Sequence, residues 1–124
     1  MPTRRSFLVS MALGLGFAAA APARAHHGWR WTSDGNFELT GVIREARLGN
    51  PHGILEVDAE DERWIVEVGQ PWRNERAGLT DELLTAGQEI VVSGQRAAEE
   101  TELRMKAERI TIAGVLYDLY PNRD

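Results

Sequence analysis

The three histidines of this chain are the residues whose types and positions point most directly to chemistry. His26 and His27 follow Ala25 directly, and His52 lies in the turn Asn50-Pro51-His52-Gly53. If an export signal is removed after Ala25, His26 becomes the first residue of the mature protein. Its α-amine and its imidazole are then two nitrogen donors on one residue, and together they can close a chelate ring on a metal ion. The histidines therefore predict a metal site at the mature amino terminus.

Copper is the metal that these donors favour. Copper(II) prefers nitrogen ligands in a square-planar or tetragonal arrangement, and it leads the affinity order of the divalent first-row metals. His26 would supply two nitrogens and His52 a third, which is the T-shaped donor set called a histidine brace. His27 would be a fourth ligand or would point away, since neighbouring side chains leave opposite faces of an extended chain. No cysteine is present, so thiolate zinc sites and iron–sulfur clusters are excluded.

Residues 1–25 have the composition of a cleaved export signal. Thr3-Arg4-Arg5-Ser6-Phe7-Leu8 matches the twin-arginine export pattern. The apolar run from Phe7 to Ala21 is shorter than the ~20 residues that cross a bilayer, and small residues precede the cut. We therefore expect a periplasmic protein that keeps no stable membrane anchor after cleavage.

The cleavage position has two candidates, after Ala25 and after Ala23. Cutting after Ala23 leaves Arg24-Ala25-His26 at the terminus. A histidine in third position binds copper(II) or nickel(II) through the amine, two deprotonated amides and the imidazole. Both termini are therefore competent for copper, but only the cut after Ala25 recruits His52 naturally.

Composition narrows the partners of the mature chain. The full sequence has a net charge of −5, and removal of residues 1–25 leaves 11 basic and 19 acidic residues, a net charge of −8. An acidic surface repels phosphate backbones and attracts cations, so we expect a metal ion as partner and no nucleic acid. The remaining ~99 residues are enough for one small domain with a single core.

Strand patterns dominate the mature sequence. Residues 37–48 roughly alternate apolar and polar side chains, the period of a half-buried strand. Gly41 inside this run predicts a bulge or a sharp bend. Further strands are expected at 54–58, 64–68, 89–95 and 103–112, the first two of these as a hairpin.

One short helical region is expected between the third and fourth strands. Gln70-Pro71-Trp72 opens a helix over 73–77 that Gly78 ends, and Thr80 is placed to cap a second helical turn. Five strands with a helix between the third and the fourth predict an all-β Greek-key barrel of the oligonucleotide/oligosaccharide-binding (OB) type. A small β-sandwich is the alternative.

The chain is therefore expected to divide into four parts. These are a signal peptide over 1–25, an irregular amino-terminal arm over 26–36, a β-barrel domain over 37–116 and a tail over 117–124. The tail ends in a Pro-Asn stretch, and we expect it to lie loosely on the surface.

Four tryptophans are many for so small a domain. Trp64 is expected in the core, and Trp72 is expected to seal the helix against the barrel. Trp29 and Trp31 are candidate ligand-binding residues, because exposed aromatic rings stack on sugars and other planar ligands. They are also spaced so that both can fold onto one face of the barrel and hold the mature amino terminus near His52.

These features together resemble a family of uncharacterised proteobacterial secreted proteins. The residues that carry the resemblance are Ala25-His26-His27, Gly41-Val42, Asn50-Pro51-His52, Gly69-Gln70-Pro71 and Ala77-Gly78-Leu79-Thr80. The resemblance covers essentially the whole mature chain, and its specific parts are Asn-Pro-His and the terminal His-His. Members have a signal peptide, an Ala-His-His start and a single small barrel. The resemblance therefore implies a secreted barrel and no particular activity.

Two functions of different classes follow from these observations. The first is a periplasmic copper carrier or sequestration module that uses His26, His27 and His52. The second is a metal-free barrel that binds a peptide, a glycan or an envelope partner protein through its aromatic face. We assign no catalytic residue, because no carboxylate pair, phosphate loop, serine elbow or zinc-protease helix has a diagnostic spacing. A copper-dependent oxidative enzyme would also need an open coordination position and a substrate surface, and it is the least favoured interpretation.

Overall fold

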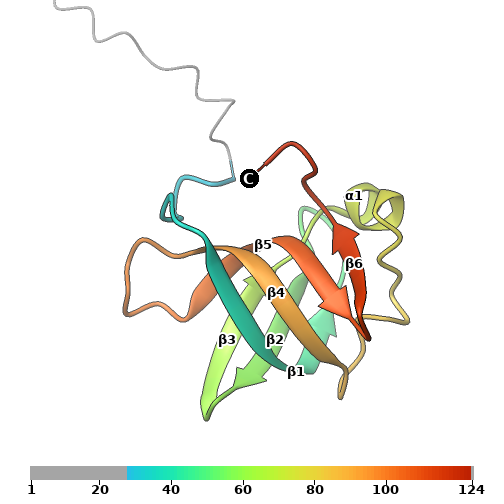
Figure 1. The fold of residues 1–124 in the computed structure, drawn as a ribbon, viewed down its shortest axis with the longest axis horizontal. Helices are drawn as coiled ribbons and strands as arrows, with labels where there is room; N and C mark the ends of the chain where they lie inside the picture. Colours follow the sequence, from blue (N-terminus) through green and yellow to red (C-terminus); the bar gives the residue numbers. More distant parts are fainter. Residues whose placement is uncertain (1–27, 124) are drawn as a thin grey trace, which may run out of the picture.

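Six β-strands and one short helix make up the described part of the chain (Figure 1). The structure, a computed structural model, describes residues 28–123, so the predicted signal peptide, His26 and His27 lie outside the described residues. The elements are β1 (Phe37–Arg47), β2 (Ile54–Ala59), β3 (Glu62–Glu67), α1 (Pro71–Arg76), β4 (Glu89–Arg96), β5 (Arg104–Ile112) and β6 (Val115–Asp118).

The strands close into a barrel. Antiparallel neighbours follow the order β3-β2-β1-β4-β5-β6, and β3 also pairs with β5 in parallel. The parallel contact includes the pairs Val66↔Met105 and Glu67↔Lys106. Strands β1 to β5 therefore form a closed ring, and β6 pairs with the far part of β5. The predicted five-stranded Greek-key barrel with one short helix is confirmed, and the sandwich alternative is wrong.

The core is filled from alternate positions of the strands. In β1, Leu39, Gly41 and Ile43 are buried while the residues between them are exposed, as the period of a strand requires. Trp64 is buried and stacks on Phe37 with ring centroids 5.1 Å apart, so its predicted place in the core is confirmed.

The predicted hairpin joins β2 to β3. Its turn is formed by Glu60 and Asp61, whose φ angles of 46° and 65° both lie in the left-handed region. Two such residues in succession are typical of a type I′ turn, whose twist matches that of the flanking strands. The pairing is regular from Ala59↔Glu62 to Ile54↔Glu67.

The irregularity of β1 does not lie at Gly41. The register between β1 and β2 shifts between Ile43 and Glu45, so the predicted bulge is displaced toward the end of the strand. Gly41 serves a close approach instead: a Cβ there would lie 2.5 Å from the carbonyl oxygen of Asp58. Only glycine leaves room here for the paired strand β2.

A second irregularity lies between β4 and β5. Gly94 pairs with Ala107 while Ser93 pairs with Arg109, so Glu108 is an extra residue on β5. A Cβ at Gly94 would lie 2.0 Å from the carbonyl oxygen of Lys106. This β-bulge places Glu108 outside the ladder between the two strands.

The helix begins two residues earlier and ends one residue earlier than predicted. It begins at Pro71, a position at which the missing N–H of proline costs no helical bond, and it ends at Arg76 before Gly78, whose φ is 83°. Its buried Asn74 side chain bonds both the N–H and the carbonyl of Gly69, each at 2.9 Å. Within residues 28–123 no helix is long and apolar enough to cross a membrane.

The second helical turn predicted after Thr80 is not a helix. The N–H of Leu83 donates to the carbonyl of Thr80 at 3.1 Å, and the chain forms only a turn there. Leu79 and Leu84 are both buried in the core at its two ends. A continuous α-helix would direct one of them away from the barrel, so core packing overrides the capping signal.

The segment after β6 is not a loose tail. Leu119 is fully buried, and the N–H groups of Leu119 and Tyr120 donate to the carbonyl of Glu108 at 2.9 and 3.3 Å. The expectation was wrong because the bulge on β5 gives the segment a backbone acceptor. Figure 1 shows this red segment beside the arm, at one end of the barrel.

Trp72 does not seal the helix against the barrel. Its side chain is 50% exposed, and its Nε1–H donates to the amide oxygen of Gln70 at 2.8 Å. The guanidinium groups of Arg73 and Arg76 lie 4.5 and 5.1 Å from its ring. Surface arginines, rather than barrel side chains, are therefore the partners of this ring.

Candidate functional site

A row of polar side chains crosses the outer face of the barrel. Glu67 on β3 is in register with Lys106 on β5, and Lys106 is in register with Gln95 on β4. Their strand neighbours Val66 and Met105 point into the core. The row is completed by His52, which lies just before β2. We call His52, Glu67, Lys106 and Gln95 the polar row.

The Glu67 carboxylate connects three members of the polar row, through a contact with His52 and an ion pair with Lys106. His52 Nε2 lies 3.6 Å from Glu67 Oε1, and Lys106 Nζ lies 3.9 Å from Glu67 Oε2. The side chains of Lys106 and Glu67 are only 2% and 9% exposed, whereas that of His52 is 25% exposed. Glu67 therefore presents one oxygen to the ammonium group and the other to the imidazole.

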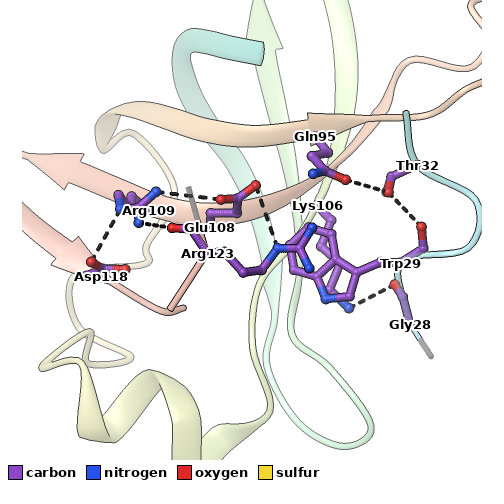
Figure 2. Close-up of polar contacts among 9 residues, drawn as sticks. All are labelled: Gly28, Trp29, Thr32, Gln95, Lys106, Glu108, Arg109, Asp118 and Arg123. Carbon is purple, nitrogen blue, oxygen red and sulfur yellow. Dashed lines mark hydrogen bonds and ion pairs between the residues drawn. The ribbon is translucent and has the colours of Figure 1, made fainter. Parts of the chain in front are cut away.

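The amino-terminal arm covers the polar row. Lys106 Nζ donates to the carbonyl of Gly28 at 3.0 Å and lies 4.8 Å from the centre of the Trp29 ring (Figure 2). Arg104 lies 3.8 Å from the centre of the Trp31 ring. Because Arg104 and Lys106 are alternate residues of β5, both tryptophans lie against the same outer face of that strand.

Gln95 attaches the next part of the arm. The single proton of the Thr32 hydroxyl goes to the carbonyl of Trp29 at 2.7 Å. The amide of Gln95 must therefore turn its NH2 group toward Thr32, 2.8 Å away. In that orientation the NH2 group also donates to the carbonyl of Ser33 at 2.7 Å, and Oε1 accepts from Arg123 Nη2 at 2.9 Å.

Burial shifts two titrations at the site. Desolvation lowers the pKa of Lys106 below its ordinary 10.5, against the opposing attraction of Glu67 and with the help of nearby arginines, Arg73 first among them. Desolvation also raises the pKa of Tyr120 above 10.0. Tyr120 packs edge-on against Trp29, with ring centroids 5.1 Å apart. The arm and the polar row thus share one desolvated interface.

The structure brings together some of the predicted site residues. His52 meets Glu67, and Trp29 and Trp31 lie on the barrel, where their rings contact side chains of the protein itself. His26 and His27 lie outside the described residues. Among residues 28–123 no group of three or more His, Cys, Asp or Glu side chains is assembled to hold a metal ion. His52 and Glu67 are thus two donors that need others to complete a site.

Sequence reasoning missed Glu67 and Lys106. Glu67 was one of many acidic residues, and only the parallel contact of β3 with β5 sets it beside a cation. Lys106 carried a signal, because it is the only lysine in the chain. It also alternates with Met105 and Ala107 on a strand otherwise suited to burial, which marks it as an outward-facing residue.

A family model described as "Family of unknown function (DUF6152)" matches residues 15–104. The chain belongs to this family. The matched DUF6152 segment contains strands β1 to β4 and the first residue of β5, together with all three histidines. It agrees with the resemblance predicted from the sequence at the level of a domain family without an assigned function. No curated protein matches the sequence significantly.

Solved structures similar to this DUF6152 chain show low sequence identity. The ZRD-deleted mutant of TiaS in complex with agmatine is 19% identical with a TM-score of 0.48, over 72% of this chain and 23% of that chain. The S. pombe Stn1–Ten1 complex is 16% identical with a TM-score of 0.48, over 62% and 57%. Yeast Stn1 and Ten1 are 8% identical with a TM-score of 0.49, over 63% and 42%. This chain thus spans less than two thirds of each, and its fold assignment rests on its own strand pairings.

Proposed function

We propose that the exported, processed protein is a periplasmic copper-binding protein, a carrier or sequestration module rather than an enzyme. Its ligands would be the α-amine and imidazole of His26, the imidazole of His52 and, as a fourth ligand, His27. Glu67 is added to this set as an oxygen donor or as a carboxylate that orients His52. The proposal assumes cleavage after Ala25.

One observation carries the proposal: the residue that directly follows His26-His27 is tied to the carboxylate that faces His52. The carbonyl of Gly28 accepts from Lys106 at 3.0 Å, and Lys106 pairs with Glu67 at 3.9 Å. A chain extends at most ~3.6 Å per residue, so two residues before Gly28 stay within about 7 Å of it along the backbone. This tether favours a site that combines the chain end with His52.

The spacing of the two described donors suits a metal ion. Bonds from a divalent ion to imidazole nitrogen and carboxylate oxygen measure roughly 2.0–2.2 Å. His52 Nε2 and Glu67 Oε1, 3.6 Å apart, can therefore contact one ion at an angle of roughly 110–130°, wider than the ~90° between neighbouring ligands of a square plane. The Glu67 carboxylate would offset part of the copper(II) charge, while its other oxygen, Oε2, would retain its ion pair with Lys106. Nitrogen donors in the majority favour copper(II).

The test is a competition titration with copper(II) on protein whose intact mass shows His26 as the first residue. We expect His52→Ala to weaken copper binding more than tenfold, and Glu67→Gln to weaken it by about 10–100-fold. Glu89→Gln, at an exposed site at the start of β4, is the matched carboxylate control and should leave affinity unchanged. Paramagnetic resonance should show nitrogen hyperfine splitting that changes in His52→Ala.

Processing supplies a second arm of the test. One extra residue ahead of His26 removes the chelate of amine and ring while leaving residues 28–123 intact. Copper affinity should then fall at least as much as in His52→Ala, with an unchanged unfolding midpoint. Wild-type copper affinity in both the extended protein and His52→Ala would reject the proposal. A native first residue of Arg24, found by intact mass, would replace it with the third-position histidine site.

The metal-free alternative, a module that binds a peptide, a glycan or an envelope partner, is favoured by one feature. The Trp72 ring is half exposed and carries two arginines beside it, whereas Trp29 and Trp31 are engaged by the protein's own side chains. Quenching of tryptophan fluorescence by a glycan or peptide library, lost in Trp72→Ala and retained in Trp31→Ala, would support this module in place of the copper protein.

A further inference from the structure

The C-terminal segment Leu119–Arg123 returns to the outer face of β5 and is held there by backbone groups. The bulged Glu108 accepts from the N–H groups of Leu119 and Tyr120, and the N–H of Arg123 donates to the carbonyl of Tyr120 at 3.0 Å. The guanidinium of Arg109 donates to the carbonyl of Arg123. The backbone of Arg123 is therefore held by its own hydrogen bonds, independently of the contacts of its side chain.

The Arg123 side chain joins three parts of the molecule (Figure 2). Its guanidinium carbon lies 3.7 Å from the centre of the Trp29 ring. Its Nε lies 3.9 Å from Glu108 Oε1, and its Nη2 donates to Gln95 Oε1 at 2.9 Å. A planar guanidinium can stack on a ring and donate in its own plane at the same time, which an ammonium group cannot do.

The two halves of the arm are attached differently. At Trp31–Ser33 the backbone bonds the end of β4 and the loop after it: Ser33 N–H donates to Arg96, and the Trp31 carbonyl accepts from Ala98, both at 2.9 Å. At Gly28 and Trp29 the described contacts to the barrel come from side chains, namely Lys106, Tyr120 and Arg123. The half nearest the histidines thus depends on the C-terminal segment.

We infer that Arg123 is a positioning residue for the amino-terminal site, and that the C-terminal segment clamps the arm onto the polar row. The clamp itself is a property of residues 28–123. Its effect on copper rests on the proposed function. Arg123 would act by fixing Trp29 and Gln95, both of which it contacts directly.

The test compares Arg123→Ala, Arg123→Lys and the control Arg44→Ala, which removes an exposed arginine from the far part of β1. In metal-free protein, amide exchange at Trp29–Thr32 should quicken at least tenfold in Arg123→Ala, while exchange in β1 and β2 stays as in wild type. Arg123→Lys should recover little, since it restores charge but not the stacked plane. Copper affinity of the processed protein should fall about tenfold in Arg123→Ala.

Thr32→Val tests the same clamp from the arm side. It removes the hydroxyl that accepts a hydrogen bond from the amide of Gln95, and it should also quicken amide exchange at Trp29. This variant keeps the clamp testable if Arg123→Ala folds poorly. Unchanged exchange in both variants would overturn the clamp. Faster exchange with unchanged copper affinity would overturn the positioning role. If wild-type protein binds no copper, the proposed function fails, and the exchange data still decide on the clamp.

Discussion

Glu67 and Lys106 form a buried ion pair that depends on both partners. Removing only the cation leaves a carboxylate that is 9% exposed without its partner. We expect Lys106→Met to lower the free energy of unfolding by about 3 kcal/mol, in the range for a broken buried pair. The double variant Lys106→Met/Glu67→Gln should return to within about 1 kcal/mol of wild type, because an uncharged pair needs no counter-ion.

Urea unfolding of the single and double variants checks this prediction. Arg44→Ala, which breaks an exposed pair with Asp58, provides the surface comparison and should change stability by less than about 1 kcal/mol. A double variant as unstable as Lys106→Met would show that packing of the lysine stem, not charge pairing, holds this part of the barrel.

The shifted pKa values of Lys106 and Tyr120 predict opposite effects on stability at alkaline pH. Because burial lowers the pKa of Lys106, the folded protein loses that proton before the unfolded chain does at pH values below 10.5, so stability should rise with pH there. Because burial raises the pKa of Tyr120, the unfolded chain deprotonates first above pH 10.0, and stability should fall. Urea midpoints measured from neutral pH to above 10.5 should show the rise missing in Lys106→Met and the fall missing in Tyr120→Phe.

At the scale of elements, the bulge on β5 decides what lies outside the barrel. It requires Gly94, whose Cβ position is occupied by the backbone of Lys106. We expect Gly94→Ala to destabilise the protein by about 3 kcal/mol or more, since the obstacle is backbone that cannot rotate away. Gly35→Ala, with nothing within 4 Å, should be nearly neutral. Thermal unfolding of the two variants makes the comparison, and equal melting temperatures would contradict it.

Local pattern was enough to predict most elements but not their connections. The strand over residues 37–48 and the hairpin around residue 60 depend on patterns among neighbouring residues, so both were predicted correctly. The contact of Glu67 with Lys106 depends on a parallel pairing between distant strands, and the bulge at Glu108 depends on a glycine in the facing strand. Neither leaves a local pattern. The role of His26 and His27 as metal ligands stays a prediction.

At the scale of the whole molecule, the C-terminal segment is part of the core. Leu119 is fully buried, while Leu116, on β6, is 59% exposed. We expect Leu119→Ala to cost about 2–5 kcal/mol of unfolding free energy, as truncation of a core leucine does. Leu116→Ala should cost less than about 0.5 kcal/mol. Chemical denaturation of both variants tests this, and equal losses would mean that the segment is only loosely packed.

The hydrogen bond from Ala98 to Trp31 lies in the loop between β4 and β5. Barrels of this type use such loops and the neighbouring strand surface to bind oligonucleotides or oligosaccharides. Here a segment of the same chain already lies there, at an effective concentration in the millimolar range or above, as for any partner joined by a short linker. An external oligomer would have to displace the amino-terminal arm from this surface. We therefore expect only ligands that bind tightly enough to compete with the arm to occupy it.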